Sequence, residues 1–135
     1  MRTSPMEDAD IGRCVTDKGV LLTLRGALFL NGRAEINTDS SLLARLLSVL
    51  SGYPDSNVSI EAHTDSLGSD GYNYDLSQRR ADSMKLYLCA HGIDLPRMNA
   101  LGKGATRPLA GNHTAAGRRQ NSRVEVIVHA IAAAI

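Results

Sequence analysis

The sequence predicts an α+β fold in which a small mixed β-sheet of about four strands packs against two main helices, in the order βαβαβ(α)β. Short segments rich in aliphatic and β-branched residues alternate along the chain with segments whose apolar residues recur at helical spacing. Turns that contain glycine, proline or asparagine separate these segments. Because helices lie between strands, the chain must cross over the sheet. The predicted strands and helices are separated by short connections, which keep the helices packed against the sheet.

The predicted strands are short aliphatic segments that end in turns. Segment 58–62 alternates apolar and polar residues, as a half-buried strand does, and segment 124–128 begins with the same alternation. A further apolar segment, 27–30, ends in a turn. The four strands are expected at residues 20–24, 58–62, 98–101 and 124–128.

The predicted helices are indicated by apolar spacing and by residues that begin or end a helix. Leucines recur at helical spacing after the N-cap sequence 38–40, and the turn 52–55 ends this first helix. A longer helix is expected over about 73–90 and ends at Gly92, because glycine is favoured just beyond the end of a helix. A short third helix is expected at 114–120.

The chain length of 135 residues predicts a single domain. Residues 1–16 have neither periodicity nor an apolar run, which indicates a flexible N-terminal lead-in. Residues 17–130 contain every predicted strand and helix and are expected to form the domain. Residues 131–135 are expected to form a short apolar tail.

The composition argues against several classes of function. A net charge of +1, with one Phe and four Tyr, does not indicate nucleic-acid binding. Cys14 and Cys89 are too few and too far apart to indicate a disulfide framework or a zinc knuckle. The sequence shows neither a run of roughly 20 apolar residues, as a membrane span requires, nor an export signal. We therefore expect either a cytoplasmic protein or a piece of an exported one whose targeting segment is missing.

Two opposite charges, Asp65 and Arg80, are the candidate ligand-binding residues. Asp65 follows the strand 58–62, and Arg80 interrupts an apolar i, i+4 stripe on the next helix. An arginine in such a stripe either reaches solvent or needs a paired anion. The residues alone leave three arrangements open: a turn-forming Asp65 beside a solvent-reaching Arg80, an internal salt bridge, or a clamp for a small zwitterion. In the clamp, Arg80 binds a carboxylate in bidentate fashion and Asp65 accepts from an ammonium group.

A metal site and a nucleophile have weaker sequence signals. His63 and Asp65 are separated by one residue and could be two metal ligands, with His113 as a third. The sequence contains no helix-borne ligand pair of the kind found in zinc enzymes, and we expect no metal and no cofactor. It also contains no GxSxG turn, and segment 102–106 lacks the full spacing of a phosphate-binding loop. No catalytic residue is therefore predicted.

A longer series of residues carries a family resemblance. It comprises Ile60-Glu61-Ala62-His63-Thr64-Asp65, Gly68-Ser69, Asn73, Leu76-Ser77-Gln78-Arg79-Arg80-Ala81, Gly92-Ile93, Arg97, Gly102-x-Gly104, Pro108, Asn112-x-Thr114 and Asn121-Ser122-Arg123-Val124-Glu125-Val126. The series resembles the OmpA-like peptidoglycan-binding domain, a family that includes the C-terminal domains of outer-membrane porins, the Pal lipoproteins and stator proteins similar to MotB. The match covers about residues 18 to 129 in the family's order. The chain departs from the family at Ala62, usually glycine, at Lys103, often tyrosine, and in lacking the paired-cysteine loop of some porins.

The resemblance implies a non-enzymatic domain that binds the meso-diaminopimelate of peptidoglycan stem peptides and anchors an outer-membrane or envelope protein to the cell wall. Asp65 matches the family's ammonium-binding aspartate, and Arg80 matches its carboxylate-binding arginine. Thr64, Asn73 and Asn31 match polar residues of the same pocket. The resemblance also implies a periplasmic location, with attachment to the membrane or envelope through a segment absent from this chain.

Two other functions stay open. One is a periplasmic hydrolase that acts on cell-wall material through His63, Asp65 and a metal. The other is a structural interaction module with no wall ligand, in which Asp65 and Arg80 only pair with each other. Arg123 and Glu125 match the closing strand of the family, and we interpret their role as structural.

Overall fold

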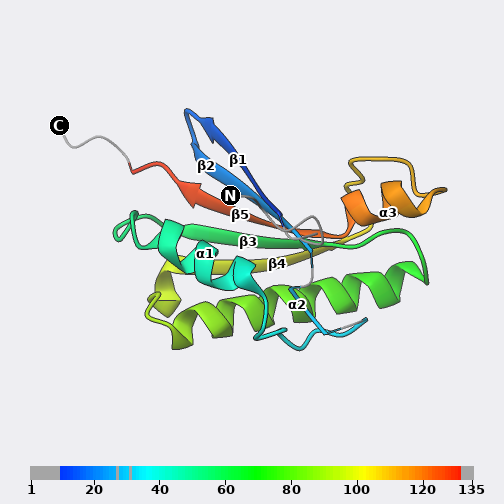
Figure 1. Ribbon diagram of the computed structural model, residues 1–135, viewed down its shortest axis with the longest axis horizontal. Coiled ribbons are helices and arrows are strands. Elements are labelled where there is room, and N and C mark those ends of the chain that lie inside the picture. The colour runs from blue at the N-terminus through cyan, green and yellow to red at the C-terminus, as the bar shows by residue number, and fades with distance from the viewer. Residues whose placement is uncertain (1–9, 27, 31, 132–135) are drawn as a thin grey trace, which may run out of the picture.

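The computed structural model describes residues 10–26, 28–30 and 32–131 (Figure 1). Its strands form one sheet in the order β1-β2-β5-β3-β4, in which β3 and β4 are parallel and the other neighbours are antiparallel. The strands are β1 (Asp10–Thr16), β2 (Gly19–Arg25), β3 (Val58–His63), β4 (Met98–Gly104) and β5 (Arg123–His129). The helices are α1 (Ser41–Leu50), α2 (Asp70–Ala90), the 3₁₀ turn η1 (Leu95–Arg97) and α3 (Ala115–Asn121). The predicted α+β fold is confirmed.

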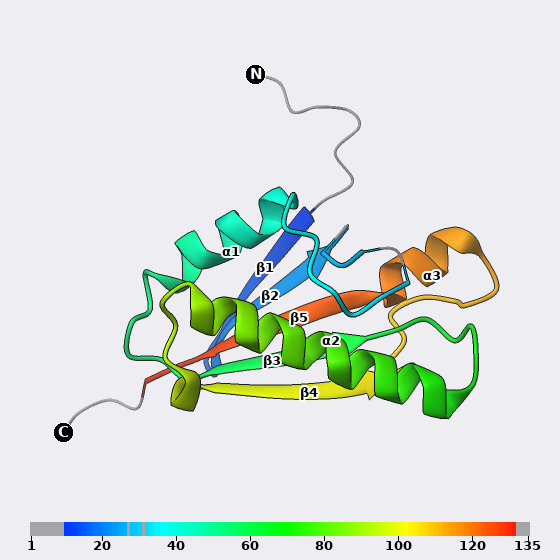
Figure 2. The same cartoon turned by 90° about the horizontal axis from the view of Figure 1, so that it is seen from below.

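Helices α1 and α2 cover the same face of the sheet, as the view from below shows (Figure 2). Alternate residues of β2, β3 and β5 are buried on that face. The core between the layers includes Leu22, Leu46, Ile60, Met84 and Val126. Each fully buried aliphatic side chain contributes about 1.5–3 kcal/mol relative to an exposed one, so this layer fixes α2 against the sheet. None of the described helices combines the length and the apolar character needed to cross a membrane.

A serine side chain caps the start of both main helices. Ser40 Oγ accepts from Leu42 N at 3.3 Å at the start of α1. Ser69 Oγ accepts from Tyr72 N at 3.1 Å, so α2 begins at Asp70, three residues before the sequence-based expectation. Gly92 has a φ angle of +105° just beyond α2, a conformation that glycine adopts without strain.

The first strand departs from the sequence-based prediction. A flexible lead-in over 1–16 is wrong for residues 10–16, which form β1 and pair antiparallel with β2. The sheet consequently has five strands rather than about four. β1 lies at the edge of the sheet and its residues 13–16 are exposed, so its sequence lacks the clear apolar alternation of a half-buried strand. Residues 1–9 and 132–135 lie outside the described residues, and the domain boundaries at 17 and 130 stay predictions.

The first half of α2 lies directly against β4. Gln78 accepts from Gly102 N at 2.9 Å and donates to Ala100 O at 3.2 Å, and Ser77 Oγ accepts from Gly104 N at 2.9 Å. A Cβ atom at Gly102 would overlap the backbone nitrogen of Gln78, so only glycine permits this approach. These contacts fix the turn of α2 that carries the predicted ligand-binding arginine.

Candidate functional site

The loop after β3 holds the Asp65 carboxylate in place. Thr64 N donates to Gly104 O at 2.8 Å, which continues the pairing with β4 beyond the strand end. Thr64 Oγ1 donates to Asp65 O at 2.9 Å. Asp65 Oδ1 accepts from Leu67 N at 2.9 Å, which forms an Asx turn. Within the described residues, Asp65 Oδ2 accepts no hydrogen bond, so this half-buried carboxylate keeps one oxygen for another partner.

The loop between β4 and α3 supports the Asp65 loop from outside. The fully buried Asn121 accepts from Leu109 N at 2.6 Å and Ala110 N at 2.9 Å. Its Nδ2 donates to Ala110 O at 2.9 Å and to Asn112 Oδ1 at 2.8 Å. Asn112 Oδ1 also accepts from Ser66 N at 3.3 Å. The start of the Asp65 loop is thereby linked to a buried hydrogen-bond network.

Arg80 lies in the apolar stripe of α2 that the sequence predicts, and its guanidinium contacts the segment before α1. Arg80 Nε donates to Arg33 O at 2.8 Å, and Arg80 Cζ lies 4.9 Å from the centroid of the Phe29 ring, within cation–π range. No described residue accepts a hydrogen bond from the Nη atoms of Arg80. One edge of the guanidinium is thus held by the protein, and its two Nη atoms are available to an anion.

Asp65 and Arg80 interact electrostatically without forming an ion pair. Burial lowers the pKa of Arg80, Tyr72 and Asp65 raise it, and Arg79 lowers it. Among the described residues, the ion pairs with a nitrogen–oxygen distance within 4.0 Å do not include Asp65 or Arg80. The internal salt bridge that the sequence left open is therefore absent from this structure, and each charge can contact a third group.

A cavity of about 420 Å³ adjoins Arg80. Arg80 and Phe29 line it together with residues of β2, β3 and β5. Asp65, Thr64 and Asn73 do not line it. Of the four described residues predicted to bind diaminopimelate, only Arg80 borders this cavity. His63, a candidate ligand of the alternative metal site, also lines it.

Thr64 and Asn73 are both buried, with exposed fractions of 6% and 3%. Asn73 lies in the first turn of α2, and its Nδ2 is buried without a hydrogen-bond partner in the described structure. A buried amide group left in this state costs about 1–3 kcal/mol. A Cβ atom placed on Gly68 would lie 3.8 Å from Asn73 Oδ1, so this amide borders the Asp65 loop. Asn31, the remaining predicted pocket residue, lies outside the described residues.

Sequence reasoning did not identify Phe29 and Arg33 as contacts of Arg80. Phe29 belongs to an apolar segment, which by itself indicates a core residue, and it pairs with Ile36 in an isolated bridge. Arg33 contributes a main-chain carbonyl, and a carbonyl leaves no signal in the sequence. The distance of 47 positions between Arg33 and Arg80 also hides the contact.

A model of the OmpA family matches residues 28–122, which is more than half of the chain and includes Asp65 and Arg80. The chain belongs to the OmpA family. This match confirms the family resemblance carried by the residues around the β3 end and the start of α2.

Relatives of this OmpA-family domain occur in larger proteins. Outer membrane porin F of Pseudomonas fluorescens is 48% identical over 85 residues, which are 63% of this chain and 26% of the porin. The peptidoglycan-binding protein ArfA of Mycobacterium tuberculosis (strain ATCC 25618 / H37Rv) is 37% identical over 99 residues, which are 73% of this chain and 30% of ArfA. The chain therefore spans about a quarter to a third of the length of these curated relatives.

Solved structures share the fold of the OmpA-family domain. The structure of the cell wall anchor of the T6SS from Pseudomonas aeruginosa has a TM-score of 0.78 and is 31% identical in sequence. The match covers 90% of this chain and 88% of that chain. The arrangement of sheet and helices is thus that of a known wall-anchor domain.

Proposed function

We propose that this domain binds peptidoglycan non-covalently through the meso-diaminopimelate of its stem peptides and anchors an outer-membrane or envelope protein to the cell wall. The observation that carries the proposal is the state of Asp65 and Arg80, two half-buried opposite charges that form no ion pair in the described structure. If Asp65 and Arg80 served only as an internal salt bridge, their charged groups would lie within ion-pair distance of each other. Relatives named as a peptidoglycan-binding protein and as a cell wall anchor support a cell-wall partner.

The chemistry of diaminopimelate suits these two groups. The end of its side chain bears an ammonium and a carboxylate on one carbon. The two Nη atoms of Arg80 face the carboxylate as a fork, because Nε already donates to Arg33 O. Asp65 Oδ2 accepts from the ammonium, while Oδ1 stays bonded to Leu67 N. A lysine side chain, which has the ammonium alone, can satisfy Asp65 but not Arg80.

Polar neighbours complete the proposed site. Thr64 and Asn73 lie on either side of the Asp65 loop, and the amide of Asn73 has a donor without a partner in the described structure. We propose that a rotation of this amide on binding brings Nδ2 or Oδ1 to the ligand. Asn31 is proposed as a further contact on the strength of the family resemblance.

The proposed site is weak for a single ligand and effective on a polymer. A hydrogen bond to a charged group contributes about 1.5–3 kcal/mol, so two such interactions give a modest affinity once the entropy of association is subtracted. Peptidoglycan displays the stem peptide in many copies, and avidity then strengthens attachment. We propose a periplasmic location for the domain, because the proposed ligand, peptidoglycan, lies in the periplasm.

We propose binding rather than catalysis. The hydrolase alternative requires His63 and Asp65 to share a metal with a third ligand, for which His113 is a candidate. The group of potential ligands found among the described residues is instead Glu61, His63 and Glu125, and it contains neither Asp65 nor His113.

Co-sedimentation with isolated sacculi tests the proposal. Asp65→Asn removes the charge but keeps an oxygen that can accept from Leu67 N, so the loop is expected to stay folded. Asp75→Asn is the matched control, because Asp75 is an exposed aspartate of α2 that pairs with Arg79 at 2.9 Å. We expect the wild type and Asp75→Asn to sediment and to be released by free meso-diaminopimelate, and Asp65→Asn to bind at least about tenfold more weakly. Equal binding by Asp65→Asn would contradict the proposal.

A further inference from the structure

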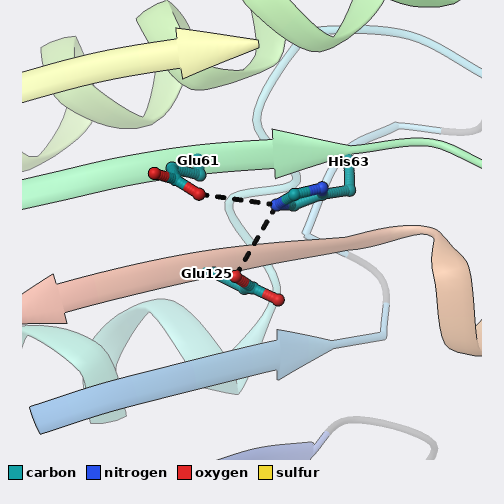
Figure 3. A group of neighbouring side chains, drawn as sticks. All are labelled: Glu61, His63 and Glu125. Atoms are coloured by element: carbon teal, nitrogen blue, oxygen red, sulfur yellow. Dashed lines mark ion pairs between the residues drawn. The ribbon is translucent and has the colours of Figure 1, made fainter. Parts of the chain in front are cut away.

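A second group of polar side chains lies on the face of the sheet opposite α1 and α2. Glu61 and His63 are two residues apart on β3 and point to the same face, and Glu125 lies opposite Glu61 in the antiparallel register of β3 and β5. All three side chains converge on one point (Figure 3). The three residues form a cluster that shares no residue with the Asp65–Arg80 site.

His63 is the unusual member of this cluster. Its exposed fraction is 2%, and neither ring nitrogen makes a hydrogen bond within the described structure, although Nε2 has ion-pair contacts with two glutamates. Buried polar groups are nearly always hydrogen-bonded, and an exception indicates a further partner such as a water molecule or an ion. His63 Nε2 lies 3.8 Å from Glu61 Oε1 and 3.7 Å from Glu125 Oε1, so this nitrogen points between two carboxylates at ion-pair distance without a hydrogen bond to either.

The separation of the three ligand atoms suits a metal ion. They lie within 4.8 Å of one another. Imidazole nitrogen and carboxylate oxygen bind zinc at roughly 2.0–2.2 Å, so two ligands of one tetrahedral ion are about 3.4 Å apart. The observed 3.7 and 3.8 Å separations need to shorten by only a few tenths of an ångström. Side-chain rotation of Glu61, which is 21% exposed, provides most of this movement.

The surrounding residues hold one ligand in position. Glu125 Oε2 accepts from Arg123 Nε at 2.8 Å, so Oε1 is turned toward His63. Arg123 is itself fixed by hydrogen bonds to Asn121 O at 2.9 Å and Arg107 O at 3.0 Å. Such outer contacts orient the ligands of metal sites.

We propose that Glu61, His63 and Glu125 bind one divalent transition-metal ion, with zinc as the expected occupant. A water molecule completes the coordination, and the ion cross-links β3 to β5 at the end of β3 from which the Asp65 loop departs. One nitrogen and two oxygens favour an ion that accepts both kinds of ligand. The proposal differs from the sequence-based expectation of no metal, and it does not depend on the identity of the wall ligand.

Zinc titration of tag-free, chelator-treated protein tests the inference. Calorimetry gives the stoichiometry and affinity, and the thermal midpoint with and without zinc gives an independent readout. Glu61→Gln is the informative variant, because Glu61 is partly exposed and the change should leave the fold intact. Glu35→Gln is the control, because Glu35 is an exposed glutamate whose ion pair, within the described part of the chain, is with Arg33.

We expect the wild type and Glu35→Gln to bind one equivalent of zinc and to melt at a higher temperature when zinc is present. Glu61→Gln should weaken binding at least about tenfold, since even changes in outer contacts of a metal site cost roughly 10–100-fold. Absence of a one-equivalent site in the wild type would overturn the proposal. An unchanged zinc affinity in Glu61→Gln would overturn it as well, because the ion would then be bound elsewhere, for instance at the exposed His113.

Discussion

The substitution Arg80→Lys separates the two roles that the structure gives to Arg80. The arginine supports the segment before α1 through the hydrogen bond from Nε to Arg33 O and the contact with Phe29. It also presents its Nη atoms to the proposed ligand. Lysine keeps the positive charge but has neither the fork of nitrogens nor the planar group that lies over a ring.

The structural part of the change has a calculable size. One hydrogen bond contributes about 0.5–1.5 kcal/mol to stability, and a cation–π contact contributes about 0.5–1 kcal/mol at a site that is not fully buried. Lysine keeps part of the second contribution. We therefore expect Arg80→Lys to lower the free energy of unfolding by about 1–2 kcal/mol, a loss that a domain of ordinary stability tolerates.

The effect on binding should be larger than the effect on stability. Loss of one charge-assisted hydrogen bond of about 1.5–3 kcal/mol weakens the affinity for a diaminopimelate peptide about 10-fold to 150-fold. Denaturant unfolding and calorimetric titration measure the two effects on the same sample. Arg79→Lys is the matched control, because Arg79 is exposed and its ion pair with Asp75 is of a kind worth only about 0.5 kcal/mol.

Two results would refute this reasoning. Full ligand affinity in Arg80→Lys, combined with reduced stability, would mean that Arg80 is only a structural residue. An equal loss of affinity in Arg79→Lys would mean that general positive charge, and not the fork of Arg80, attracts the ligand.

Three further predictions concern the framework of the site. Gly102→Ala should lower the free energy of unfolding by about 3 kcal/mol or more, and with it the melting temperature, because the new Cβ overlaps the Gln78 backbone. An unchanged melting temperature would contradict the close approach of α2 to β4. Asn121→Ala should lower the free energy of unfolding by about 3 kcal/mol or more, since four hydrogen bonds of a fully buried amide are lost. Amide hydrogen exchange in segment 105–114 should become faster, and unchanged protection there would contradict the prediction. In metal-free protein, the His63 side chain and then the Arg123 hydrogen bond lower the pKa of Glu125 to about 2, against the opposing effect of burial. Because this pKa is below its ordinary value of 4.5, the contribution of Glu125 to stability is present above pH 4.5 and disappears as the pH falls toward 2. Glu125→Gln should flatten the acid limb of stability by about 1–2 kcal/mol after allowance for solvent screening, and an unchanged acid limb would contradict the assignment.

The sequence predicts those features of the fold that local chemistry determines. The cap at Ser40, the leucine stripe of α1 and the glycine after α2 each depend on a few neighbouring residues, and each appears as expected. The same holds for the apolar stripe that Arg80 interrupts, because helical periodicity is fixed within α2 itself.

Features that depend on tertiary structure were not predictable. Strand β1 is stable only because it pairs with β2, and its own residues give no clear alternation. The absence of an Asp65–Arg80 ion pair depends on how the segment around Arg33 holds the guanidinium. The cluster of Glu61 and His63 with Glu125 depends on the insertion of β5 between β2 and β3, and Glu125 is 62 positions from His63.

The central claim is that Asp65 and Arg80 together recognise a carbon that bears both an ammonium and a carboxylate. Calorimetric titration of the wild type with two stem tripeptides, one ending in meso-diaminopimelate and the other in lysine, tests it most directly. The peptides differ by the carboxylate that Arg80 is proposed to bind. We predict measurable binding of the diaminopimelate peptide and an affinity at least about tenfold lower for the lysine peptide. Equal affinity for the two peptides would contradict the claim.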